Sequence, residues 1–286
     1  MWATRILFKR PFFLLICFAF LAGCEESIEP KFTDDSKIAV TAELIAGQPP
    51  VIHIVELNSI GKTGPPKTIE DAEVIIQDLQ TKEIFSFLPL SNGYWKNERF
   101  QAQFGKAYQL NIKSKNQEVN ALCTIPLSFT ANAELNDNNR STIRLNLPET
   151  NVPALIIALE SRSYRMEGNS IVYLDDWKYI TMECEDPATD NIRYGELSAP
   201  YFKLFVPAKA TARQLNFTPE YQNGMRKFRI HIKSVEPTYY KYVYDYEYLK
   251  KNNFDGANSF IGLQSNINNG LGIFAGVYEK VIELAK

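Results

Sequence analysis

The sequence has few of the residues that most catalytic and metal sites need. It contains two histidines, His53 and His231, and four cysteines. A zinc site draws on several ligands of these types, so none is expected. A Ser-His-Asp hydrolase is also disfavoured, because no Gly-x-Ser-x-Gly elbow occurs, and no Gly-rich phosphate loop is present. We therefore expect a protein that is not an enzyme and has no catalytic residue, no cofactor and no metal site.

Basic runs and long apolar runs are missing from the body of the chain. No stretch of Lys and Arg follows the pattern of a phosphate-binding surface, and the net charge is −2, so nucleic acid is not an expected partner. After residue 24 no apolar run reaches the roughly 20 residues that a membrane-spanning helix needs. The expected partners are therefore neither nucleic acids nor the interior of a bilayer.

The first 23 residues have the composition of a secretory signal. A positive start, a short apolar stretch and small residues at the end are its signs. They correspond to Arg5, Lys9 and Arg10, then residues 11–20, then Ala22 and Gly23. The apolar stretch is too short for the alternative of a transmembrane anchor.

Leu21-Ala22-Gly23-Cys24 resembles a lipobox, the site where a signal peptidase cuts before a diacylated cysteine. This predicts that residues 1–23 are removed, that Cys24 is lipidated, and that residues 24–35 form a tether. Two or three acyl chains on one cysteine hold a protein at a membrane, since each buried methylene contributes about 0.8 kcal/mol. We expect an outer-membrane location through this lipid anchor, with surface exposure left open. Glu25-Glu26 resembles a surface-export signal of Bacteroidetes lipoproteins, and a solvated tether explains it equally well.

Removal of the signal takes away three cationic residues and no acidic ones, which changes the net charge from −2 to −5 and leaves 263 residues. Cys17 leaves with the signal and Cys24 takes the lipid, so Cys123 and Cys184 remain. The compartment permits a disulfide. Both residues lie in strand-like apolar stretches, however, which favours two buried free thiols.

Short runs of β-branched and aromatic residues, separated by Gly, Pro, Asn and Asp, dominate the mature chain. They predict an all-β protein: an immunoglobulin- or transthyretin-like β-sandwich over residues 36–126, then a second β-rich domain over residues 127–286. The boundary rests on residues 131–139, which are polar without an apolar period. In the strand predicted at 227–235, alternation places His231 on a solvent-exposed face.

Residues 238–252 are the one ambiguous element. Tyrosines at every second position indicate a strand, whereas Tyr239, Tyr242 and Tyr246 also share one helical face. Pro237 before the segment and a lysine pair near its end favour a helix near 238–252. The tyrosines either form a ligand platform or pack against the sheet, and packing is the more ordinary role.

The order of several motifs resembles the DUF4249 family of Bacteroidetes, lipoproteins without an established function. They are Cys24-Glu25-Glu26 before the strand at 38–42, residues 69–76, Gly93-Tyr94-Trp95, residues 104–110, residues 235–242 and residues 265–276. In the last of these, Gly270 and Gly272 are expected to permit close backbone approach, with Phe274 in the core. The resemblance implies a cell-envelope lipoprotein, with a TonB-dependent receptor as a candidate partner.

One acidic group remains as a candidate site for an enzyme or for calcium, at Asp175, Asp176, Glu183, Glu185 and Asp186. Facing carboxylates serve glycosidases, and oxygen-rich loops bind calcium, but the spacing matches no known loop, which favours a solvated edge.

The preferred function is a non-catalytic binding or accessory protein for a TonB-dependent receptor, with an unknown ligand site. The alternatives are a structural or adhesive spacer and an enzyme acting on envelope polymers.

Overall fold

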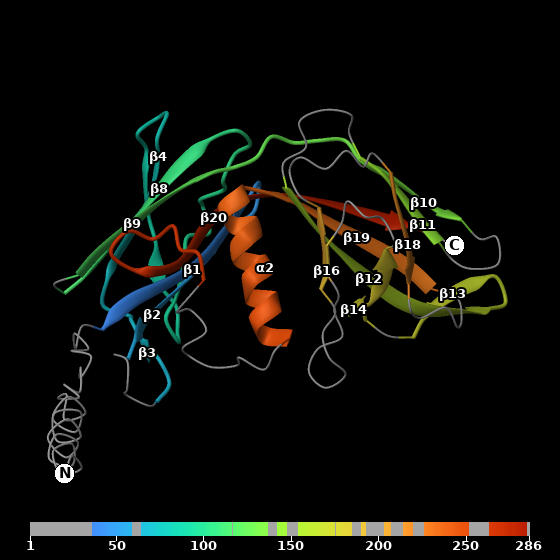
Figure 1. Cartoon of the computed structure of the whole chain (residues 1–286), viewed down its shortest axis with the longest axis horizontal. Coiled ribbons are helices and arrows are strands. Elements are labelled where there is room, and N and C mark those ends of the chain that lie inside the picture. The colour runs from blue at the N-terminus through green and yellow to red at the C-terminus, as the bar shows by residue number, and fades with distance from the viewer. Residues whose placement is uncertain are drawn as a thin grey trace, which may run out of the picture. The chain divides into compact units, whose positions relative to one another are not determined.

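The protein is built almost wholly of β-strands, as Figure 1 shows for a computed structural model of the chain. The structure describes residues 36–58, 64–115, 117–136, 142–147, 154–174, 176–184, 190–192, 203–206, 214–219, 226–251 and 263–284. Within these ranges there is one helix, α2 (Pro237–Lys251). The predicted all-β fold with one helix near 238–252 is therefore confirmed.

The described strands form three sheets. In the largest, the order is β16–β17–β12–β19–β20–β1–β2–β7–β6, while β13 and β14 pair with β12 and β3 pairs with β2. Its strands are β1 (Lys37–Ile45), β2 (Val51–Leu57), β3 (Lys67–Thr68), β6 (Leu88–Pro89), β7 (Tyr94–Lys96), β12 (Ala154–Glu167), β13 (Ser170–Tyr173), β14 (Lys178–Ile180), β16 (Asp190–Ile192), β17 (Lys203–Val206), β19 (Arg226–Val235) and β20 (Leu271–Leu284).

Two smaller sheets share cores with this large sheet. One has the order β5–β4–β8–β9 and the other the order β10–β11–β18–β15. Their strands are β4 (Glu73–Asp78), β5 (Ile84–Ser86), β8 (Ala107–Ser114), β9 (Gln117–Thr124), β10 (Asn132–Asn136), β11 (Thr142–Asn146), β15 (Met182–Cys184) and β18 (Gln214–Pro219). The first core joins β1 and β2 to β4, β8 and β9, and the second joins β12 and β19 to β11 and β18.

Strand β20 connects the early and late parts of the chain. Its first half, from Leu271 to Val277, pairs in parallel with β1, and its second half, from Val277 to Leu284, pairs antiparallel with β19. Residues 35–286 accordingly form one compact unit. The predicted division at residues 126 and 127, and the immunoglobulin or transthyretin assignment, stay predictions.

The glycine-rich turn before β20 permits a close approach between backbones, as expected from the sequence. Gly272 has φ +104°, and a Cβ there would lie 2.0 Å from the Val40 carbonyl oxygen, so only glycine permits this approach of β20 to β1. Phe274 is fully buried in the first core. The Asn266 side chain holds the turn by donating to the Phe274 carbonyl (2.7 Å) and accepting from the Phe274 N–H (2.9 Å).

The prediction for the polar stretch at 131–139 is wrong, whereas the packing role predicted for the tyrosines of α2 agrees with the structure. The polar stretch assigned to a domain boundary contains strand β10, which pairs with β11, so the expectation of no regular period there is wrong. Ala133 and Leu135 pack on the second core, while the polar residues that alternate with them are exposed, which is a strand pattern too short and too polar to be recognised. Helix α2 packs Tyr239, Tyr242 and Val243 against the sheet, in agreement with the more ordinary role proposed for its tyrosines.

Candidate functional site

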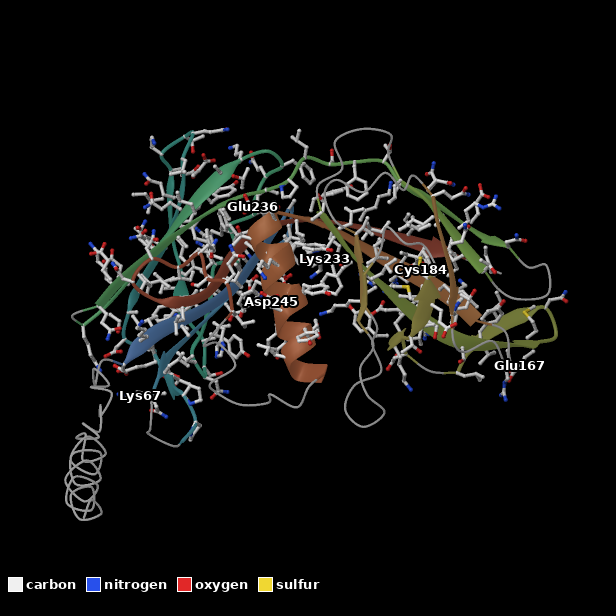
Figure 2. All side chains as sticks on the ribbon, in the orientation of Figure 1. Lys67, Glu167, Cys184, Lys233, Glu236 and Asp245 are labelled. Carbon is white, nitrogen blue, oxygen red and sulfur yellow. The ribbon has the colours of Figure 1, made fainter. Side chains whose placement is uncertain are left out.

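A pocket of about 220 Å³ lies between helix α2 and one face of the large sheet. Its lining combines apolar side chains with charged side chains of both signs. The lining residues are Glu43 of β1, Ile156 and Ala158 of β12, Tyr179 of β14, Lys203 of β17, His231 and Lys233 of β19, Glu279 of β20, and Tyr239 and Val243 of α2. Lys233, labelled in Figure 2, appears beside α2.

Strand alternation and register bring these residues together. Along β19, Phe228, Ile230 and Ile232 enter the second core, so His231 and Lys233 point to the opposite face. Across the sheet Lys233 is directly opposite Ile156 on one side and Glu279 on the other. A row across neighbouring strands therefore places an apolar, a cationic and an acidic side chain next to each other.

Lys233, Glu43 and Tyr239 form the first charged group. Lys233 Nζ lies 2.7 Å from Glu43 Oε2, and the Tyr239 hydroxyl donates to Glu43 Oε1. Burial alone lowers the pKa of Lys233, but the Glu43 carboxylate outweighs it and the pKa is raised. Burial, followed by the same carboxylate, raises the pKa of Tyr239 well above its ordinary value. Lys233 therefore stays protonated and Tyr239 stays neutral near neutral pH.

His231 forms the second group, bridging two carboxylates. Its Nδ1 lies 2.9 Å from Glu279 Oε1 and its Nε2 lies 2.9 Å from Glu160 Oε2. Burial opposes the charged imidazole, yet the hydrogen bonds and charges of the two acids raise its pKa. The hydrogen bond from His231 lowers the pKa of Glu279.

The prediction that His231 is an exposed surface residue is wrong, since its side chain is 16% exposed. The alternation was right, but acidic neighbours cover that face.

Lys203 and Glu247 form a third pair, which ties α2 to β17. Lys203 Nζ bonds Glu247 Oε1, and the Glu247 side chain is almost fully buried. At the N-terminal end of the helix, Glu236 (Figure 2) accepts a hydrogen bond of 3.0 Å from the Thr124 backbone N–H. These contacts hold α2 at both ends over the pocket.

The lining of the pocket carries as many acidic as cationic side chains when His231 is neutral. Its lining has the acids Glu43 and Glu279 and the cations Lys203 and Lys233, with His231 adding a charge when protonated. Each of these cations has an acidic partner within ion-pair distance. Such a site offers donors and acceptors to a ligand without a strong field of one sign.

The other histidine lines a second, more open hollow of about 440 Å³, which shares Glu43 with the pocket. The His53 ring stacks on Tyr94 with ring centroids 4.4 Å apart, and burial lowers its pKa. The two histidines therefore lie in separate environments, and among the described residues no group of His, Cys, Asp and Glu is arranged to hold a metal ion.

The candidates singled out in the sequence fall elsewhere. Cys24 and the signal at 1–23 lie outside the described residues, as do Asp175, Glu185 and Asp186. Asp176 and Glu183 are exposed. Cys123 and Cys184 are buried free thiols in the first and second cores, which agrees with the favoured alternative. None of the helices in the described part of the chain has the length and apolar character to cross a membrane.

Sequence reasoning missed the pocket itself. Glu43, Lys203, Lys233 and Glu279 lie far apart along the chain, so no short motif joins them. One signal was available: Glu43 and Lys233 are charged residues inside strands whose other face is apolar. Charges at such positions require partners on the same face.

Comparison with known families gives one result. The sequence model of a family described as "Domain of unknown function (DUF4249)" matches residues 25–282. A comparison with curated proteins finds no match.

Proposed function

The chain belongs to the DUF4249 family, whose description assigns no activity, and from the pocket beside α2 we propose that it is a non-catalytic binding protein of the cell envelope. In this proposal it is a Bacteroidetes lipoprotein anchored to the outer membrane through Cys24. It acts as an accessory protein to a TonB-dependent receptor, and the pocket is where its ligand binds.

The observation that carries the proposal is the state of the titratable groups in the pocket. General acid–base catalysis works best with a pKa near the operating pH. In the pocket, the pKa of Lys233 is raised and that of Glu279 is lowered, so both move away from neutrality, whereas the pKa of His231 is raised from 6.5. His231 uses both ring nitrogens on Glu160 and Glu279, which leaves neither one for a substrate proton. The arrangement suits binding better than proton transfer.

The pocket also favours a binding protein over a spacer. A spacer needs no lined cavity, whereas ligand sites are concave and combine apolar surface with a few placed polar groups. Ile156, Ala158 and Val243 supply the apolar part, and the ion pairs supply the polar part.

The accessory role is tested by purifying the full-length protein, with a C-terminal affinity tag, from detergent-solubilised outer membranes. Recovery of a TonB-dependent receptor in near-equal amount supports the role, and a preparation without any receptor contradicts it. Cys24→Ser serves as the matched control, because it keeps the folded body and removes the lipid attachment. We expect this variant to leave the membrane fraction, and its retention there would count against the anchor.

The pocket is tested separately with Ala158→Leu. Ala158 lines the pocket and is only partly buried, so the larger side chain fills the cavity without removing a member of any ion pair. Glu134→Leu on the exposed side of β10 is the control. Reduced uptake of the receptor's ligand in cells carrying Ala158→Leu, but not Glu134→Leu, supports the proposal. Equal uptake in both would contradict it.

A further inference from the structure

A row of aromatic side chains continues the pocket along the sheet. Tyr173, Trp177 and Tyr179, here called the aromatic row, each lie against a basic side chain of β12 or β19. The pairs are Tyr179 with His231 (ring centroids 5.8 Å apart), Trp177 with Arg229 (Cζ 4.2 Å from the ring centroid), and Tyr173 with Arg162 (Cζ 4.2 Å) and Lys227 (Nζ 5.1 Å). Because Tyr179 also lines the pocket, the row begins at the pocket.

The row follows the direction of β19 away from α2. Lys227, Arg229, His231 and Lys233 are alternate residues of that strand and so lie on one face, the face that carries the pocket. Tyr173 is 36% exposed and Tyr179 is 38% exposed, so both rings remain accessible. Each ring offers flat apolar area together with a polar tip, and the cation behind it fixes its position.

The charges beside Trp177 and Tyr179 are paired as they are in the pocket. Arg229 lies 2.6 Å from Glu283 and 3.7 Å from Glu160, just as Lys233 lies against Glu43 and His231 against Glu279. A charged ligand would have to separate such pairs, which costs desolvation and leaves one partner uncompensated. A neutral hydroxyl both donates and accepts, so it hydrogen-bonds to a carboxylate and an ammonium group without separating them.

Size limits what the pocket holds. Its volume of about 220 Å³ is below the roughly 300–1,000 Å³ of drug-sized ligand sites. It therefore suits one small unit of a longer ligand, while the aromatic row provides flat surfaces for the units that follow. Sugar rings match both requirements, since their hydroxyl edges hydrogen-bond to charged groups and their C–H faces stack on aromatic rings.

We propose that the pocket and the aromatic row together bind a neutral carbohydrate chain, with one sugar in the pocket and the next units over Tyr179 and Trp177. This inference rests on the proposed function, because it requires the pocket to be the binding site. It adds the chemical class of the ligand and the surface along which the ligand extends.

The test uses the full chain in detergent and three groups of probes. The neutral probes are maltohexaose, cellohexaose, laminarihexaose, mannohexaose and xylohexaose, each with its monosaccharide. Oligogalacturonate represents acidic chains, and glycine, alanine and trialanine represent zwitterions. Binding is measured by titration calorimetry. Trp177 serves as a fluorescence reporter, because Trp95 is buried in the first core.

We expect at least one neutral hexasaccharide to bind, and Ala158→Leu to abolish that binding. Trp177→Ala and Tyr179→Ala should each weaken binding of the hexasaccharide about tenfold, which corresponds to roughly 1.4 kcal/mol. Trp177→Ala should leave binding of the monosaccharide nearly unchanged. Tyr248→Ala, an exposed tyrosine of α2 that does not line the pocket, is the control and should have no effect.

Three results would overturn the inference. Binding of only acidic or zwitterionic probes contradicts a neutral ligand, and unchanged hexasaccharide affinity in Trp177→Ala contradicts the aromatic row. Absence of binding to all probes, while a receptor still co-purifies, also overturns the carbohydrate assignment and leaves the accessory role intact. Loss of the receptor with carbohydrate binding preserved would contradict the accessory role and leave the carbohydrate assignment intact.

Discussion

Glu43 of β1 and Lys233 of β19 lie 2.7 Å apart although 190 residues separate them in the chain. Strand β20 lies between the two strands and pairs with both. The ion pair, and the pocket that it lines, therefore require β20 to be in place between β1 and β19. The site depends on the whole topology and on no single segment.

Replacement of Lys233 by Met should destabilise the protein, because it leaves the Glu43 carboxylate with Tyr239 as its remaining partner. The Lys233 and Glu43 side chains are 27% and 33% exposed. We therefore expect the free energy of unfolding to fall by about 1–2 kcal/mol, below the cost of breaking a fully buried pair. Urea denaturation measures it. The double variant Glu43→Gln/Lys233→Met should lose less than the sum of the single variants. Additive losses would mean that the pair contributes nothing.

The close approach of β20 to β1 predicts a large effect of Gly272→Ala. The added Cβ meets the Val40 carbonyl oxygen at 2.0 Å and φ is +104°, so we expect a loss of at least about 3 kcal/mol. Gly47→Ala is the matched control. Gly47 has φ +76° with no atom within 4 Å of the added Cβ, and should lose only about 1–2 kcal/mol from the backbone conformation. Equal losses in thermal or urea unfolding would contradict the steric explanation.

The stability of the protein should depend on pH through His231. Its folded pKa is raised from 6.5, so its stabilising contribution is fully present below that value and is lost as the pH rises through the folded pKa. The pKa of Glu279 is lowered from 4.5, so its contribution is present above that value and is lost as the pH falls through the folded pKa. We expect the wild type to lose free energy of unfolding as the pH rises above about 6.5 and through the folded pKa of His231, and His231→Gln to lose less. Identical pH profiles would show that the bridge has no effect on stability.

The turn before β20 should depend on the Asn266 amide. This side chain donates to the carbonyl oxygens of Leu122 (3.1 Å) and Phe274 (2.7 Å) and accepts from the Phe274 N–H. Asn266→Ala leaves these backbone groups without that partner, and we expect a loss of about 2 kcal/mol. Asn268→Ala is the control. Its amide donates a solvent-exposed hydrogen bond to the Asn120 side chain, and we expect a loss of about 0.5 kcal/mol or less. Similar unfolding curves for the two variants would contradict the role assigned to Asn266.

Thiol labelling should distinguish the two free cysteines from a disulfide. Cys123 and Cys184 are buried in different cores, and burial raises the pKa of the Cys123 thiol well above its usual value. With Cys24 blocked by the proposed lipid, we expect no reaction with a thiol reagent under native conditions and reaction of both residues after unfolding. A protein that stays unreactive when unfolded without reductant would instead contain a bridge.

The fold was more accessible from the sequence than the site was. The alternation in β19 and the caps of α2 are local signals, and they predicted a strand and a helix that the structure confirms. Strand β10 escaped notice because only Ala133 and Leu135 face a core. His231 was placed correctly on its face, yet its neighbours Glu160 and Glu279 belong to other strands. Local pattern determines where a side chain points, whereas its partners depend on pairing between distant strands.

If the pocket beside α2 binds a ligand, that ligand should stay bound when the protein is purified from cells. The most direct measurement is to purify the wild type, Ala158→Leu and Glu134→Leu from their own membranes and identify by mass spectrometry the compounds that each releases on unfolding. We expect the wild type and Glu134→Leu to release the same compound and Ala158→Leu to lack it. The same compounds in all three preparations, or none from the wild type, would contradict a binding site beside α2.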